Sequence, residues 1–106
     1  MTTNGSGQFT LTLSDSTQKW SETQSQTLAT ATLASAEVIA EAPSRGTVLP
    51  LADFGTVSFT SALANGKAIG SFNPDEITMV TSSGIIKAQP SGLSSGENFS
   101  DTWQHS

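Results

Sequence analysis

The sequence predicts an all-β fold, an antiparallel β-sandwich, on the strength of three observations. Apolar and polar residues alternate with a period of two along much of the chain, and helical spacing is scarce. Clusters of Ser, Asp, Asn, Pro and Gly separate these alternating stretches at regular intervals. The chain has 106 residues and a mass of 10.9 kDa, which leaves room for one domain. About eight short strands separated by turns are typical of a sandwich or of part of one.

The N-terminal part of the chain shows the clearest alternation. Phe9, Leu11 and Leu13 fall on one face of a predicted strand, and hydroxyl side chains fall on the other. The polar residues 1–7 are expected to form a flexible segment ahead of a domain at residues 8–106. The strands predicted in this part are residues 8–13, 19–22 and 27–33, with a helix as the less favoured reading of the last stretch.

The C-terminal part is predicted to contain further strands joined by tight turns. Asn65 and Gly66 form a hairpin signal, and Ser-Ser-Gly at residues 82–84 connects two β-branched stretches. Pro43 ends a strand, because proline has no N–H to donate to a β-ladder. The strands predicted here are residues 36–42, 56–60, 76–80, 85–88 and 98–103, with a short extended piece at 67–69.

Two carboxylates mark the predicted strand at residues 36–42. Glu37, Ile39 and Glu41 fall on one face of it, which indicates a face that is partly enclosed and partly wet. An edge strand protected by charge would show the same pattern, so that structural reading stays open. At about 3.3 Å per residue the two carboxylates would lie roughly 13 Å apart. They therefore cannot share a proton as an aspartic dyad does.

Composition and charge exclude several classes of function. The net charge is -5, and the four basic residues are scattered, which argues against nucleic acid and anionic membrane as partners. The chain has no Cys and one His, His105, so the sequence predicts no metal site, no cofactor and no Ser-His-Asp triad. Residues 1–7 lack the apolar core of a signal peptide.

The remaining chemistry-bearing residues have structural readings that are at least as good as functional ones. Asp53 precedes Phe54-Gly55 and is predicted to stabilise a tight turn there. Trp20 and Trp103 could stack on a sugar or a peptide, but aromatic anchors of a small β core are the commoner use of such residues.

Several stretches together resemble one protein family. These are SAEVIAEAPS at residues 35–44, VLPLADFGTVSF at 48–59, SFN at 71–73 with ITMV at 77–80, and the ending at 99–103. In order and spacing they resemble the C-terminal half of the glutamic peptidases, also called eqolisins or family G1, and most closely the bacterial, cysteine-free members. The resemblance covers nearly all of this chain but about half of a complete member. It implies a lectin-like, concanavalin A-type β-sandwich and a secreted, acid-active endopeptidase.

The resemblance also assigns roles to residues. Glu37 matches the catalytic Glu, which acts as general base on water, and Glu41 is expected to contact substrate. The family writes a Trp where this chain has Val38, and its catalytic Gln lies in the N-terminal half. The isolated chain is therefore expected to be inactive, and to pair with itself as a homodimer or with a complementary N-terminal half. Its expected substrate is a peptide or an unfolded protein. The alternative function is a non-catalytic lectin-like or adhesion module.

Overall fold

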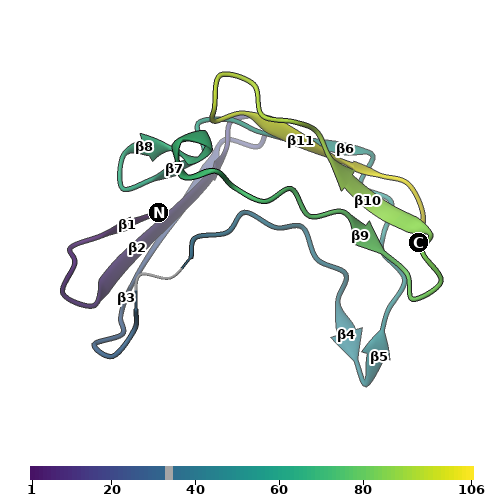
Figure 1. Cartoon of the computed structure of the whole chain (residues 1–106), viewed down its shortest axis with the longest axis horizontal. Helices are drawn as coiled ribbons and strands as arrows, with labels where there is room; N and C mark the ends of the chain where they lie inside the picture. The colour runs from purple at the N-terminus through teal and green to yellow at the C-terminus, as the bar shows by residue number, and fades with distance from the viewer. Residues whose placement is uncertain (33–34) are drawn as a thin grey trace. The chain divides into compact units, whose positions relative to one another are not determined.

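The computed structural model describes residues 1–32 and 35–106, and these are almost entirely strands and loops (Figure 1). All the registered strand pairs are antiparallel, which confirms the predicted all-β class and is consistent with a sandwich-like fold. The chain divides into two compact units. Unit 1 comprises Met1–Glu37 and Leu63–Lys67, and unit 2 comprises Val38–Ala62 and Ala68–Ser106.

Unit 1 is built on a three-stranded sheet with the order β1-β2-β3. Its strands are β1 (Thr2–Thr3), β2 (Gln8–Asp15) and β3 (Trp20–Thr27). The hairpin of β2 and β3 pairs without a break from Gln8 opposite Thr27 to Asp15 opposite Trp20. The carboxylate of Asp15 accepts hydrogen bonds from the backbone N–H groups of Thr17 and Gln18, which closes the predicted turn.

The two faces of the β2–β3 hairpin differ as the alternation predicts. On one face, hydroxyl groups pair across the strands, with 2.9 Å between Thr10 Oγ1 and Ser25 Oγ. On the other face, Phe9, Leu11 and Leu13 lie opposite polar side chains of β3. Leu11 and Leu13 are 51% and 58% exposed, so this apolar face is largely open to solvent.

The N-terminal residues contribute to unit 1. Thr2–Thr3 forms β1, which pairs with β2, and the Met1 ammonium group donates to the carbonyl oxygen of Leu63 at 2.9 Å. The backbone N–H of Asn65 donates to the Met1 carbonyl oxygen at 2.9 Å. The flexibility of residues 1–7 and the domain boundary at residue 8 stay predictions, because they concern motion and independent folding.

Unit 2 is built on a four-stranded sheet with the order β6-β11-β10-β9. Its strands are β6 (Thr56–Phe59), β11 (Phe99–Trp103), β10 (Ile86–Pro90) and β9 (Met79–Val80). Unit 2 also contains β4 (Ser44–Arg45), β5 (Thr47–Val48) and the 3-10 turn η1 (Ile69–Phe72). Of the two remaining short strands, β7 (Leu63–Ala64) belongs to unit 1, and β8 (Lys67–Ala68) lies at the boundary between the units. Asn65 and Gly66 join β7 to β8 with φ angles of 51° and 74°, as the predicted Asn-Gly turn requires.

The sheet of unit 2 has one mostly apolar face and one polar face. Phe99 lies opposite Phe59, and Trp103 lies opposite Ala88, so the large side chains share one face. The rings of Phe59 and Phe99 stack with their centroids 4.9 Å apart. Ala88 and Leu51 are the buried apolar residues of the described chain, which makes this face the small core of the unit.

Three of the predicted strands are wrong or too long. Residues 36–42 form no strand. The strand predicted at residues 27–33 does not form either, because β3 ends at Thr27 and residues 28–32 are not in a strand. Leu33, the last residue of that prediction, lies outside the described residues. Of the strand predicted at 76–80, only Met79–Val80 pairs. Alternation shows which face a strand would bury, but a strand forms only where another backbone accepts its hydrogen bonds.

Candidate functional site

Glu37 lies in an irregular segment at the end of unit 1, with its side chain exposed. Glu41 is also exposed, but it belongs to unit 2. The predicted arrangement of these two carboxylates along one strand face is therefore wrong, because residues 36–42 do not form a strand. Their assigned roles, catalysis for Glu37 and substrate contact for Glu41, stay predictions.

A hollow of about 250 Å³ lies in unit 1, close in the chain to Glu37. It is lined by Met1, by side chains from β2 and β3, and by the segment that follows β3. Ser35 lines it, and Glu37 is two residues further on. The lining residues are mostly apolar: Met1, Phe9, Leu11, Gln26, Leu28, Ala31, Thr32 and Ser35.

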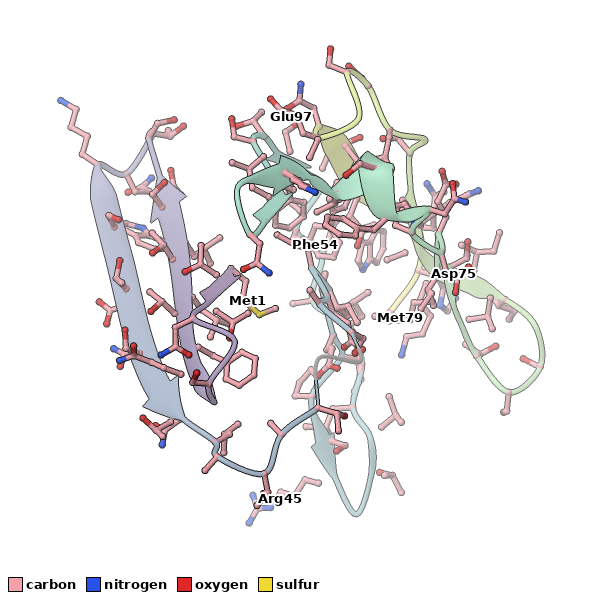
Figure 2. All side chains as sticks on the ribbon, turned by 60° about the vertical axis from the view of Figure 1, so that its left-hand side comes forward. Met1, Arg45, Phe54, Asp75, Met79 and Glu97 are labelled. Carbon is pink, nitrogen blue, oxygen red and sulfur yellow. The ribbon has the colours of Figure 1, made fainter. Side chains whose placement is uncertain are left out.

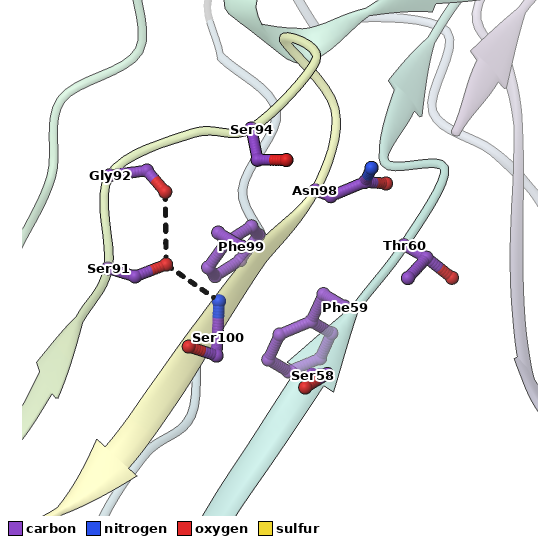
Figure 3. A pocket seen from close by; sticks show the side chains of 9 residues that line it. All are labelled: Ser58, Phe59, Thr60, Ser91, Gly92, Ser94, Asn98, Phe99 and Ser100. Carbon is purple, nitrogen blue, oxygen red and sulfur yellow. Dashed lines mark hydrogen bonds between the residues drawn. The ribbon is translucent and has the colours of Figure 1, made fainter.

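A second hollow, of about 280 Å³, lies over β6 and β11 in unit 2 (Figure 3). The stacked rings of Phe59 and Phe99 form its base. The Ser91 hydroxyl donates to the Gly92 carbonyl oxygen at 3.0 Å and accepts from the Ser100 backbone N–H at 2.9 Å. Its described lining holds hydroxyl, amide and aromatic groups and no carboxylate, so it offers no general base.

Asp101 is an acidic residue that the sequence analysis did not single out. It lies at the centre of β11, opposite Val57 of β6 and Pro90 of β10. Its Oδ1 atom is buried and has no hydrogen-bond partner among the described residues. Burial raises the pKa of the Asp101 carboxyl above its ordinary value, and a hydrogen bond with the Thr102 backbone opposes this rise. The sequence does indicate this position, because alternation places Asp101 on the same face of β11 as Phe99 and Trp103.

The other predicted residues have structural roles or stand apart from the hollows. The Asp53 carboxylate accepts from the Gly55 backbone N–H at 2.8 Å, which confirms the predicted turn. The Trp103 indole N–H donates to the Leu51 carbonyl oxygen at 3.1 Å, whereas Trp20 is 46% exposed. Residues 1–32 and 35–106 contain no group of three or more potential metal ligands. No helix in this same part of the chain is long and apolar enough to cross a membrane.

Comparison with known families decides the classification. The family model of the Peptidase A4 family matches residues 1–100. The chain belongs to the Peptidase A4 family. This is the family of the scytalidoglutamic, or G1, peptidases, so the chain is a glutamic peptidase-type domain. No curated protein and no solved structure gives a significant match.

Within the Peptidase A4 family, the matched range contains both the segment around Glu37 and the segment from Val48 to Phe59. The second segment provides Leu51, the turn at Asp53, and strand β6 in this structure. The matched range therefore includes the segment that supplies part of the small core of unit 2.

Proposed function

We propose that this chain is the Glu-bearing part of a secreted, acid-active glutamic endopeptidase of the bacterial type, with Glu37 as its general base. The observation that carries the proposal is the Peptidase A4 match over residues 1–100, which includes the motif around Glu37. Support from the structure is that Glu37 is exposed and so accessible to water and substrate.

In the proposed reaction a single carboxylate, that of Glu37, carries out both proton transfers of peptide hydrolysis. The ionised Glu37 takes a proton from a water molecule, whose oxygen attacks the carbonyl carbon of the scissile peptide bond. The resulting tetrahedral intermediate collapses when the protonated Glu37 returns its proton to the leaving nitrogen, and the carbon–nitrogen bond breaks. A carboxyl group can serve in both steps only if its pKa lies near the working pH.

The oxyanion of that intermediate needs a hydrogen-bond donor, which the family provides as a Gln side chain. None of the chain's Gln residues matches the family's Gln position. Gln24, for example, donates to the Glu22 carboxylate on the same strand, β3. We therefore assign the catalytic Gln to a polypeptide segment outside this sequence. The isolated chain is then inactive, and Glu41 contributes substrate contact only in the completed site.

A complementation assay tests this proposal. The chain is mixed with the Gln-bearing half of a glutamic peptidase, and cleavage of an unfolded protein is followed at acid pH. Cleavage is expected from the mixture, little or none from either part, and none when the chain carries Glu37→Gln. Glu41→Gln is the matched control, because Glu41 is also exposed and carries the same charge. Equal cleavage by the wild-type and Glu37→Gln mixtures would overturn the proposal.

A second candidate function is a non-catalytic lectin-like or adhesion module. One observation favours it, namely that the Trp20 side chain is 46% exposed and could stack on a sugar ring. Trp103 does not share this property, since its indole N–H is bound to Leu51. Saturable carbohydrate binding that is weakened by Trp20→Ala and unaffected by Glu37→Gln would favour this function over the peptidase.

A further inference from the structure

The apolar hollow of unit 1 has no role in the chemistry described so far. Leu11 and Leu28, which line it, are 51% and 53% exposed, so they are accessible from solvent. Figure 2 shows the Met1 side chain, another lining residue, beside the strands of this unit. Leu13 lies on the same face of β2 and is 58% exposed, but it is outside the lining.

We propose that this hollow binds one apolar side chain of a peptide substrate, of the size of Leu, Met or Phe, next to the bond that Glu37 hydrolyses. The inference rests on the proposed function, because it takes Glu37 to be the general base. It adds to that function a substrate preference and the residues that set it.

The position of the hollow in the chain supports this assignment. Ser35 lines the hollow, and two residues of chain place the Cα atom of Glu37 within about 7 Å of the Cα atom of Ser35. An extended peptide advances by about 3.3 Å per residue, so about 7 Å corresponds to two residues of substrate. This separation along the chain allows a side chain within two positions of the scissile bond to reach the hollow while Glu37 acts on that bond.

The size and lining of the hollow determine what it can accept. At about 250 Å³ it is smaller than the hollows of about 300–1,000 Å³ that hold whole small-molecule ligands. Its walls are mainly the side chains of Phe9, Leu11, Leu28 and Ala31, and none of the described residues that line it has an ionisable side chain. A charged side chain would lose hydration there, whereas an apolar one would bury its surface.

A direct binding measurement tests the inference without requiring activity. Two capped pentapeptides, Ala-Ala-Leu-Ala-Ala and Ala-Ala-Ser-Ala-Ala, are titrated into the full chain, and the methyl NMR signals of Met1, Leu11 and Leu28 are followed. The Leu peptide is expected to shift these signals with an affinity at least about tenfold above that of the Ser peptide, since burying one Leu side chain is worth that much. Equal affinities of the two peptides, or no change in these methyl signals with either peptide, would overturn the inference.

Two variants and a matched control locate the binding site. Leu11→Ser removes part of the lining and Ala31→Leu fills the hollow, so each is expected to weaken binding of the Leu peptide by about tenfold. Leu13→Ser changes an equally exposed leucine on the same strand face and is expected to leave binding unchanged. Preserved dispersion of the amide NMR signals shows that each variant is folded. An equal loss of affinity for the Leu peptide in Leu11→Ser and Leu13→Ser would contradict binding in this hollow.

Two different experiments distinguish failure of this inference from failure of the proposed function. Discrimination between the Leu and Ser peptides tests the hollow alone, and the complementation assay with Glu37→Gln tests the catalytic role alone. If the two peptides bind equally but cleavage still depends on Glu37, the chain is part of a glutamic peptidase whose side-chain preference is set elsewhere.

Discussion

The indole N–H of Trp103, at the end of β11, donates a hydrogen bond of 3.1 Å to the carbonyl oxygen of Leu51. Leu51 lies in an irregular segment, and its side chain is buried with only 6% of its surface exposed. Trp103 in turn lies opposite Ala88 of β10, the other buried apolar residue of the described chain. This one bond therefore ties a loop without regular structure to the small core of unit 2.

Removing that bond is expected to destabilise unit 2. Trp103→Phe keeps an aromatic ring but leaves the Leu51 carbonyl oxygen without its donor, at a cost of about 1–3 kcal/mol in the free energy of unfolding. Chemical denaturation followed by circular dichroism measures this change. Trp20→Phe is the control, because Trp20 is 46% exposed, and it should change stability by less than about 0.5 kcal/mol. Equal effects of the two substitutions would contradict the structural role of Trp103.

Asp101 makes the stability of unit 2 depend on pH. Burial raises the pKa of its carboxyl in the folded chain above the ordinary value of 3.8, so the folded chain holds this proton more tightly than the unfolded chain. The stabilisation is complete below the ordinary pKa and is lost as the pH rises through the raised pKa. This direction suits a protein proposed to act in acid.

Asp101→Asn tests this linkage, since the amide does not titrate. The melting temperature of the wild-type chain minus that of Asp101→Asn is expected to fall as the pH rises from about 3 to about 7, because Oδ1 of the ionised carboxylate is buried without a hydrogen-bond partner among the described residues. Using the difference cancels the titration of the other carboxylates. A difference that is constant over this range, or that rises, would show that Asp101 is not buried in the folded chain.

The close approach of two glycines fixes a turn in unit 2. The backbone N–H of Gly70, in η1, donates to the Gly96 carbonyl oxygen at 2.7 Å, and a Cβ atom on Gly70 would lie 2.8 Å from that oxygen. Gly70→Ala therefore forces the backbone apart and is expected to cost about 1–3 kcal/mol of stability. Thermal melting measures this cost. Gly92→Ala should be tolerated, because a Cβ there would make only an ordinary 3.7 Å contact with the Glu76 carboxylate; a larger loss at Gly92 would contradict this account.

Local patterns predicted the elements whose partners are close in sequence. The β2–β3 hairpin and the turn at Asn65-Gly66 formed where alternation and turn residues placed them, because each strand meets its partner through a short connection. The segment at residues 36–42 alternates as well as a strand does, but within the described residues no strand forms there. Pairing between distant segments, such as β6 with β11, cannot be inferred from either sequence segment alone.

The features of the candidate site also differ in whether they could be predicted from the sequence. Glu37 came from the family resemblance, since its physical pattern fits a protected edge strand equally well. Asp101 could have been found from alternation, because an acid at an inward position between Phe99 and Trp103 breaks the apolar pattern of β11. The hollow of unit 1 could not have been found, because its lining combines residues from Met1 to Ser35 that only the folded hairpin brings together.

The most direct test of the catalytic claim is the rate of peptide-bond cleavage at acid pH by the complemented chain, compared between wild type and Glu37→Gln. Loss of a general base predicts a fall in rate of about 10²–10⁴-fold, with little change for Glu41→Gln. An unchanged rate with Glu37→Gln, in a preparation whose melting temperature matches that of the wild type, would contradict the assignment of Glu37 as the general base.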